Sequence, residues 1–193
     1  QSFAGTGSLL IDTDGELKIS NTSFSGMSLT IEKGTVTLEK VDFINNQTGS
    51  STAGGTIRNT STAKITMTDC KITGSATNGS GGAFYANNGA VVSLNNCTFD
   101  GNKSGAEGGA IYFNGTSSFV VNDCTFTNNT AVKGGAMSVL AASINGASFD
   151  GNEATTAAND VYLRAASSCV TLSDAFDGLT VTYSGANVGV KIA

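Results

Sequence analysis

Two stretches of the chain, CTFDGNKSGAEGGAIYF at residues 97–113 and CTFTNNTAVKGGAMSV at residues 124–139, show the pattern that decides the fold. Each begins with Cys-Thr-Phe, reaches an Asn three residues after the Phe, and continues to a Gly-Gly-Ala followed by an apolar residue. The same marks recur on both sides of these stretches, at intervals of 23 to 29 residues. A period of this length is typical of a solenoid, in which each repeat forms one turn.

Two motifs define the repeat. The Gly-Gly pairs are Gly54/Gly55, Gly81/Gly82, Gly108/Gly109 and Gly134/Gly135. The Phe-x-x-Asn motifs are Phe43/Asn46, Phe99/Asn102, Phe126/Asn129 and Phe149/Asn152, and Ile72 and Phe176 hold the Phe position in two further copies. We expect the Gly-Gly pairs to form a turn that needs positive φ and the Phe side chains to be buried.

Alternation between the marks predicts strands, because side chains of a strand point alternately to opposite faces and only the buried face stays apolar in every copy. After each Gly-Gly pair, one strand has the inward positions Ile57, Phe84, Ile111 and Met137. A second strand has Val36, Ile65, Val92 and Phe119 inward. The phase then slips at a polar pair, such as Thr68-Asp69 or Asn95-Asn96, and a third strand ends at the Phe mark.

These elements predict an all-β fold, a right-handed parallel β-helix of roughly seven coils with three short strands in each. Such a unit cannot bury its apolar face alone, but stacked units form a continuous core. We expect one domain over residues 1–193, with regular coils at 16–165 and a terminal coil or cap at 166–193. The chain has no Pro, which agrees with strands that pair on both sides.

Composition excludes several classes of function. The net charge is −5 and basic residues do not cluster, which argues against a nucleic-acid partner. No apolar run is long enough for a membrane span and no leader precedes the repeats, so we expect a mature or excised chain. There is no His and no Cys-x-x-Cys pair, so we expect neither a metal site nor a cofactor.

Two columns of polar or reactive residues, one of Cys and one of Asn, are assigned to the fold and not to a functional site. Cys70, Cys97 and Cys124 share one inward column, where adjacent coils would hold their Cα atoms about 4.8 Å apart. Parallel in-register side chains fit the disulfide torsion poorly, so we expect buried free thiols, with Cys169 as the more exposed thiol. The Asn residues of the Phe-x-x-Asn motifs occupy one corner column and predict an amide ladder.

The paired motifs, such as Gly108-Gly109-Ala110-Ile111 with Phe126-Thr127-Asn128-Asn129, resemble the repeats of chlamydial polymorphic membrane proteins over roughly residues 40–165. This resemblance implies the passenger of an autotransporter, displayed on the bacterial surface by a C-terminal outer-membrane barrel and acting as an adhesin toward host cells. The chain would then be a fragment of a longer passenger. Two copies depart from the pattern: Gly54-Gly55-Thr56-Ile57 lacks the Ala, and Ile72-Thr73-Gly74-Ser75 replaces Phe-x-x-Asn.

Since the motif residues are assigned to the fold, a receptor should contact their outward neighbours. Arg58, Tyr85 and Tyr112 form one outward column on successive coils, and Arg and Tyr are enriched at binding hot spots. This column is our candidate receptor-binding face. The alternative is an aromatic ladder that only stabilises the sheet.

An enzyme is the main rival, because parallel β-helices also include enzymes that cleave polysaccharides. Asp100 and Asp150 share a corner position two coils apart, about 9.6 Å in a regular stack, a spacing that suits inverting hydrolysis. However, Asp-Gly is a common turn pair and Thr127 lies between the two. We therefore expect no enzymatic activity. A polysaccharide-binding or polysaccharide-degrading protein, or a structural spacer of the passenger, remains the alternative.

The sequence thus predicts an adhesin domain at the bacterial cell surface, either associated with the outer membrane or secreted. Its expected partner is a protein or glycan receptor on a host cell. Self-association is a further expectation, since an open repeat edge invites pairing with another chain.

Overall fold

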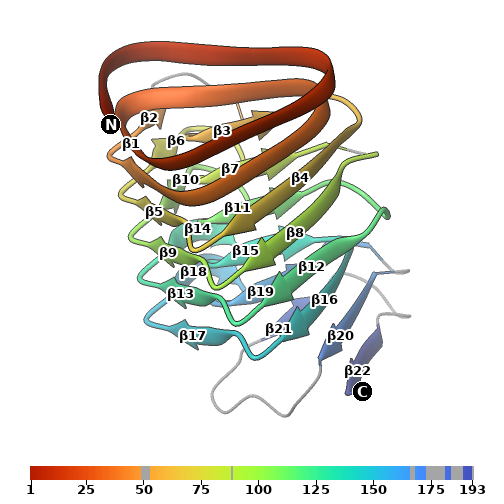
Figure 1. Cartoon of the computed structure of the whole chain (residues 1–193). Coiled ribbons are helices and arrows are strands. Elements are labelled where there is room, and N and C mark those ends of the chain that lie inside the picture. Colours follow the sequence, from red (N-terminus) through yellow and green to blue (C-terminus); the bar gives the residue numbers. More distant parts are fainter. Residues whose placement is uncertain (49–52, 88, 166–167, 173–180, 184–188, 193) are drawn as a thin grey trace.

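A computed structural model describes residues 1–48, 53–87, 89–165, 168–172, 181–183 and 189–192. Within these ranges the chain is a solenoid of parallel strands without helices, and the N-terminal turn and the last strands lie at opposite ends (Figure 1). The predicted all-β, right-handed parallel β-helix is confirmed. Phe176, assigned above to the Phe column, lies outside the described residues.

Three stacks of strands run along the solenoid (Figure 1). The first contains β3 (Ile57–Asn59), β7 (Phe84–Ala86), β11 (Ile111–Phe113), β15 (Met137–Val139), β19 (Val161–Leu163) and β21 (Val181–Tyr183). The second contains β4 (Ala63–Thr68), β8 (Val91–Asn95), β12 (Phe119–Asn122), β16 (Ala141–Asn145), β20 (Cys169–Leu172) and β22 (Gly189–Ile192). The third contains β5 (Lys71–Thr73), β9 (Thr98–Asp100), β13 (Thr125–Thr127) and β17 (Ser148–Asp150).

The strands pair in the predicted register. Ile57 lies opposite Phe84, Phe84 opposite Ile111, and Ile111 opposite Met137, all in parallel pairs. The coil count differs slightly, since the solenoid has about five turns instead of roughly seven.

The N-terminal part winds as one continuous strand, β1 (Ser2–Ile44). Its second half pairs with β3, β4 and β5. Its first half forms a separate turn that bonds to the second half, as in the bond from Ser23 N to Gln1 O at 3.1 Å. Phe3, Phe24 and Phe43 stack with successive centroid distances of 5.3 Å, so the Phe column extends to the N-terminal end.

Each regular turn contains a fourth short strand that the sequence analysis missed. These strands form a separate five-stranded sheet: β2 (Gln47–Thr48), β6 (Ala76–Thr77), β10 (Lys103–Ser104), β14 (Thr130–Lys133) and β18 (Glu153–Ala157). Most are short and have no apolar alternation, so periodicity gives no signal for them.

The predicted corner between the second and third strands is confirmed by backbone geometry. Lys40, Asp69, Asn96 and Asp123 have φ values of 51–53°, and Gly146 has 65°. Asx residues tolerate this left-handed conformation better than most, which explains the polar pairs at the phase slip.

The expectation of positive φ at the Gly-Gly pairs is confirmed for the first glycine of each pair and wrong for the second. The first glycines have φ values between 62° and 82°: Gly54, Gly81, Gly108 and Gly134. The second glycines do not adopt positive φ: Gly55, Gly82, Gly109 and Gly135. A conformational requirement therefore explains only half of each motif.

Close approach of neighbouring turns is the reason for the second glycine. A Cβ on Gly82 would lie 2.0 Å from Gly109 O and 2.6 Å from Lys103 O, both on the next turn. A Cβ on Gly109 would lie 2.0 Å from Gly135 O in the same way. The role predicted for Gly82 and its equivalents is thus corrected: a steric limit, rather than φ, excludes a side chain there.

Candidate functional site

The three residues of the predicted face lie on adjacent turns in one outward column. Arg58 pairs with Tyr85, and Tyr85 with Tyr112, at the centres of β3, β7 and β11. All three side chains are partly exposed. The two Tyr rings stack in parallel, with centroids 5.3 Å apart and planes 6° apart. The aromatic ladder is thus present, and it leaves open whether the same column also binds a partner.

Arg164 covers one end of this ladder. Its Nη1 donates to Tyr112 Oη at 2.7 Å, and its guanidinium carbon lies 4.3 Å from the centre of the Tyr112 ring. Its Nη2 donates to Phe113 O at 3.0 Å and to Asn114 Oδ1 at 2.9 Å. On the turn between them, Ser138 holds the position that Tyr112 and Tyr162 hold on the neighbouring turns.

Arg164 could not be predicted from the sequence, because it contacts residues about 50 positions earlier and belongs to no repeated column. The arrangement also sets the protonation state of Tyr112. Burial raises the pKa of Tyr112, and the nearby Arg164 guanidinium offsets this in part. Tyr112 therefore stays neutral over the physiological range and keeps a hydroxyl proton to donate.

Arg58 lies at the other end of the ladder and differs in having no fixed partner. Among the described residues, no hydrogen bond or ion pair holds its guanidinium, and its Nε is buried without a partner. A buried unpaired donor costs about 1–3 kcal/mol. Arg58 as a whole is partly exposed, so a partner can contact it although the Nε itself is enclosed.

Beyond Tyr112, the column continues into a closed polar cluster. Ser138 Oγ donates to Glu107 Oε2 at 3.0 Å, and Lys133 Nζ lies 3.7 Å from Glu107 Oε1. Lys133 also donates to Tyr162 Oη at 3.4 Å, a bond that raises the pKa of Lys133. Because these groups contact one another, the available end of the column is the one with Arg58 and Tyr85.

The Phe residues of the motifs face inward, away from any partner. Phe43, Phe99 and Phe126 are fully buried, and Phe149 is partly buried. The centroids of Phe99 and Phe126 are 5.0 Å apart, and those of Phe126 and Phe149 are 5.1 Å apart. These residues hold the turns together and position the outward column.

The glycines of the motifs are also inaccessible to a partner. Both members of every Gly-Gly pair are buried, and backbone hydrogen bonds connect them to the next turn. Gly81 N donates to Glu107 O at 2.9 Å, and Gly82 N donates to Gly108 O at 3.1 Å. Their role is to let the turns stack closely, which agrees with their assignment to the fold.

The Asn column forms the predicted amide ladder over three turns. Asn102 Nδ2 donates to Asn129 Oδ1 at 3.0 Å, and Asn129 Nδ2 donates to Asn152 Oδ1 at 2.9 Å. The second proton of each amide goes to a carbonyl of the preceding turn. Asn46 does not join the ladder, which corrects its predicted role: Ser75 occupies the next turn, and neither amide atom of Asn46 has a partner among the described residues.

The Cys column matches its predicted geometry. Cys70, Cys97 and Cys124 are buried free thiols, and Cys169 is a partly exposed free thiol. The pKa of Cys70 is raised by its hydrogen bond with Cys97 and by burial. The pKa of Cys97 is raised to about 12, first by its bond with Cys124. The pKa of Cys124 is lowered by the same bond with Cys97. Burial gives all three thiols the role of small apolar side chains.

Asp100 and Asp150, the candidate catalytic carboxylates, lie in register, but the Asp100 carboxylate already accepts hydrogen bonds from neighbouring side chains. Asp100, Thr127 and Asp150 lie opposite one another on successive turns. Asp100 Oδ1 accepts bonds from Thr127 Oγ1 at 2.8 Å and from Asn128 Nδ2 at 3.0 Å. Within the described ranges, no group of three or more His, Cys, Asp or Glu side chains is arranged to hold a metal ion.

Comparison with known proteins identifies the architecture. The family model described as "Right handed beta helix region" matches residues 7–190. The chain belongs to the right-handed β-helix family. No match was found among curated proteins or among solved structures.

Right-handed β-helix proteins include enzymes resembling pectate lyase as well as proteins without enzymatic activity. Membership is consistent with adhesion and with polysaccharide binding or degradation, and it favours no single one of them. The part of this β-helix protein that the structure describes has no helix long and apolar enough to cross a bilayer.

Proposed function

We propose that this β-helix protein is a surface-displayed adhesin domain of a bacterial autotransporter. It binds a protein or glycan receptor on a host cell through the outward column of Arg58, Tyr85 and Tyr112. The bacterial surface is its expected location, either bound to the outer membrane or secreted. The resemblance of its repeats to those of chlamydial polymorphic membrane proteins supports the source and the location.

The observation that carries the proposal is the unpaired cation at the end of an aromatic ladder. Tyr85 and Tyr112 are held rigidly by stacking, so little conformational entropy is lost when a partner binds them. Arg58 brings a half-buried guanidinium with an unsatisfied Nε to the same surface. The Nε itself is enclosed, but no described residue holds the guanidinium of this partly exposed side chain, so a receptor carboxylate or carbonyl can form charge-assisted bonds with it, and such bonds are strong.

A saturation binding experiment on cultured epithelial cells tests the proposal. The wild-type chain should bind saturably, and the triple variant Arg58→Ala, Tyr85→Ala, Tyr112→Ala should bind at least about tenfold more weakly. The double variant Lys64→Ala, Lys71→Ala is the matched control, because these exposed cations lie on the second and third strand stacks. Circular dichroism checks that each variant is folded.

Three results would contradict the proposal in different ways. Equal binding by wild type and triple variant would keep adhesion and reject this face. Loss of binding in the lysine control alone would move the contact to another face. No saturable binding by wild type would leave the spacer interpretation.

The polysaccharide alternative has weaker support, because Thr127 and Asn128 occupy the Asp100 carboxylate and separate it from Asp150. The chain should release no reducing ends from acidic or neutral polysaccharides. Release that disappears in both Asp100→Asn and Asp150→Asn would establish hydrolysis and reject this part of the account.

A further inference from the structure

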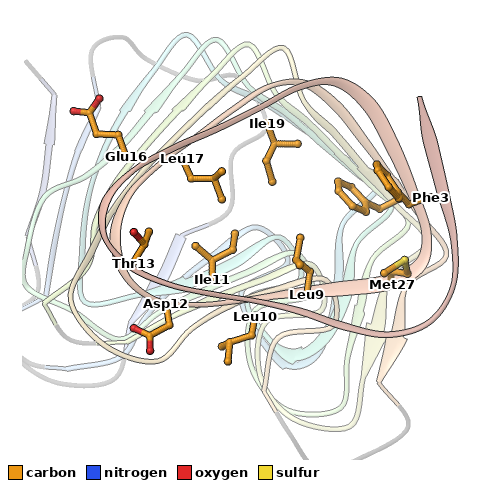
Figure 2. A pocket seen from close by; sticks show the side chains of 11 residues that line it. Phe3, Leu9, Leu10, Ile11, Asp12, Thr13, Glu16, Leu17, Ile19 and Met27 are labelled. Atoms are coloured by element: carbon orange, nitrogen blue, oxygen red, sulfur yellow. The ribbon is translucent and has the colours of Figure 1, made fainter.

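The first turn of β1 encloses a cavity of about 620 Å³ (Figure 2). Leu9, Ile11 and Leu17 point into this cavity, whereas the carboxyl groups of Asp12 and Glu16 point away from it. The cavity walls are therefore mainly apolar. Groups that can react with one another lie instead in the corners and crossings between the strand stacks, where several Asn residues precede a Gly.

An Asn-Gly pair brings an amide carbon and a backbone nitrogen together. The N–H of the glycine can attack Cγ of the Asn side chain, because glycine has no Cβ to obstruct the approach. The two groups belong to adjacent residues, so the reaction needs no encounter and depends on local geometry and charge. The chain has four such pairs, and the structure describes both residues of Asn78-Gly79, Asn114-Gly115 and Asn145-Gly146.

A cation holds the side-chain carbonyl oxygen of Asn114. Arg164 Nη2 donates to Asn114 Oδ1 at 2.9 Å. The same guanidinium is fixed by its bonds to Tyr112 Oη at 2.7 Å and to Phe113 O at 3.0 Å. When a nitrogen adds to Cγ, negative charge develops on Oδ1, and a donor that is already in place stabilises this charge without reorganisation. Arg164 thus lies where an oxyanion donor is needed.

The backbone at this pair leaves the attacking nitrogen available. β11 ends at Phe113 and β12 begins at Phe119, so the pair lies in the crossing between two strand stacks. Asn114 N donates to Ala86 O at 2.8 Å, but within the described residues no hydrogen bond holds Gly115 N. Gly115 is buried, and a Cβ on it would lie 3.1 Å from the Phe113 ring. Charges interact more strongly beside such an apolar group than in water.

The pair Asn78-Gly79 differs at the attacking nitrogen. The Asn78 side chain is exposed, but Gly79 N donates to Thr77 Oγ1 at 3.1 Å. This bond must break before the nitrogen can attack Cγ. Exposure alone therefore does not make this pair the most reactive one.

The pair Asn145-Gly146 differs in the charge beside it. Asn145 is the last residue of β16, and its Nδ2 donates to Asn122 Oδ1 at 2.7 Å. The Asp123 carboxylate occupies the space where a Cβ on Gly146 would lie. A carboxylate next to the attacking residue opposes the negative charge that the attack creates.

We propose that Asn114 is a site of self-catalysed modification, at which Gly115 N displaces ammonia from the side-chain amide and Arg164 stabilises the oxyanion. The bond from Gly115 N to Cγ forms, the bond from Cγ to Nδ2 breaks, and the proton of the attacking N–H leaves with the ammonia. Water then opens the cyclic imide at either carbonyl group. The products are aspartate and isoaspartate at position 114.

The modification changes the surface beside Tyr112. The new carboxylate faces Arg164, and the charge-assisted bonds between them are stronger than the bond from Arg164 to the amide. In the isoaspartate product the β-carbon enters the main chain and lengthens the crossing between β11 and β12. The inference rests on the geometry around Asn114 and not on the adhesin proposal, so either can fail alone.

Peptide mass spectrometry of the purified chain, aged under native conditions in a mildly alkaline buffer, tests the inference. Asn114 should convert at least about tenfold faster than Asn145 or Asn78. After denaturation the three residues should convert at similar rates, because the fold and not the dipeptide distinguishes them. Chromatography of the peptides separates aspartate from isoaspartate.

Variants test the role assigned to each group. Arg164→Ala should slow the conversion of Asn114 at least about tenfold and leave Asn145 unchanged, so Asn145 reports in the same sample that the variant is folded. Gly115→Ala should also slow it, with Arg164 still in place. Lys64→Ala is the matched control and should convert like wild type, since this exposed cation lies on the second strand stack.

The inference is overturned if Asn114 in the native chain converts no faster than Asn145. It is also overturned if Asn114 keeps the same advantage after denaturation. A rate that is unchanged or raised in Arg164→Ala would overturn it as well, because Arg164 would then protect the amide instead of activating it.

Discussion

Thr56 replaces the Ala that follows the Gly-Gly pair in the next three turns, and Ser75, in the same turn as Thr56, replaces the Asn of the Phe-x-x-Asn motifs. Their hydroxyl groups are hydrogen-bonded to each other and both are buried. The two departures from the repeat motifs are therefore one compensated change: the larger Thr takes the space that the Asn amide would need. The consequence is that Asn46 loses its ladder partner.

Exchanging both residues should restore the ladder. In Thr56→Ala, Ser75→Asn, the new amide bonds to Asn46, and the free energy of unfolding should rise by about 1–2 kcal/mol. Ser75→Asn alone should destabilise, since Thr56 remains in the way, and Thr56→Ala alone should cost about 1 kcal/mol. Guanidinium denaturation of the four proteins measures the coupling. Additive effects of the two single changes would contradict this explanation.

The buried thiol column predicts a count of reactive groups. Of the four Cys residues, only Cys169 is partly exposed, and the raised pKa values of Cys70 and Cys97 leave them as unreactive thiols near neutral pH. The hydrogen bond with Cys97 lowers the pKa of Cys124, so burial alone keeps this thiol from reacting. A thiol reagent should titrate about one group in the native chain and all four after denaturation. Rapid reaction of the other thiols in the native chain would show that the column is accessible.

The raised pKa of Cys97 makes the free energy of unfolding depend on pH. An unfolded Cys loses its proton near pH 8.5, whereas the pKa of Cys97 in the fold is about 12. Stability from this thiol is complete below about pH 8.5 and is lost as pH rises toward 12. A Cys97→Ala variant should lose less stability than wild type between about pH 8.5 and 11, when both are followed by chemical denaturation. Parallel loss in the two proteins would contradict the shift.

At the scale of the element, neighbouring turns approach so closely that two glycines per turn are required for different reasons. A Cβ on Gly82 or Gly109 would meet the backbone of the next turn at 2.0 Å, whereas a Cβ on Gly101 would meet nothing within 4 Å. Gly101 has a φ of 64°, so a side chain there brings only left-handed strain.

Gly109→Ala should therefore lower the free energy of unfolding by at least about 3 kcal/mol, because the turns must separate. Gly82→Ala should behave like Gly109→Ala, since its Cβ meets the same kind of contact. Gly101→Ala should cost about 1–2 kcal/mol through its backbone conformation alone. Thermal or chemical denaturation compares the three. Similar costs at all positions would mean that the backbone relaxes around Gly82 and Gly109 without strain.

Arg164 links β19 to β11 across the intervening turn, through two backbone or amide contacts and the Tyr112 ring. Arg164→Ala should destabilise the chain by about 1–3 kcal/mol. Arg164→Lys should recover only part of this, because an ammonium group cannot reproduce the planar fork of donors. If Arg164→Lys recovered the full stability, Arg164 would stabilise the chain through its charge alone.

Periodic features of the strands were accessible from sequence, and non-periodic ones were not. The alternation of Ile57, Phe84 and Ile111 predicted the strand, its register and the outward position of Tyr85. The short strands such as β10 escaped prediction because they have no apolar pattern. Arg164 escaped because it contacts Tyr112 and Asn114, about 50 positions earlier, and belongs to no repeated column.

The two glycines of the Gly-Gly motif show what the sequence alone leaves open. Glycine at a repeated position indicates that a side chain is excluded, but the sequence does not say whether φ or a neighbouring backbone excludes it. Positive φ was the correct reason at Gly81 and the wrong one at Gly82, where the carbonyl of Gly109 occupies the space. The distance between turns decides this, and it becomes visible only in the stacked solenoid.

At the scale of the whole molecule, the inward-facing motif residues form the core, and the outward-facing, variable residues form the surface that a partner can contact. The core residues are repeated because each turn must match the next. The outward positions are free to differ, and Arg58 and Tyr85 occupy a surface where, among the described residues, no competing partner holds the guanidinium. We propose that this surface contacts the receptor.

Photocrosslinking on living cells tests that claim most directly. The photoreactive residue p-benzoyl-phenylalanine replaces Tyr85, and in a matched protein it replaces Lys64, an exposed residue of the second strand stack. We predict a covalent adduct with a host surface molecule from the Tyr85 position and little from the Lys64 position. Adducts from the Lys64 position with none from the Tyr85 position would contradict the account.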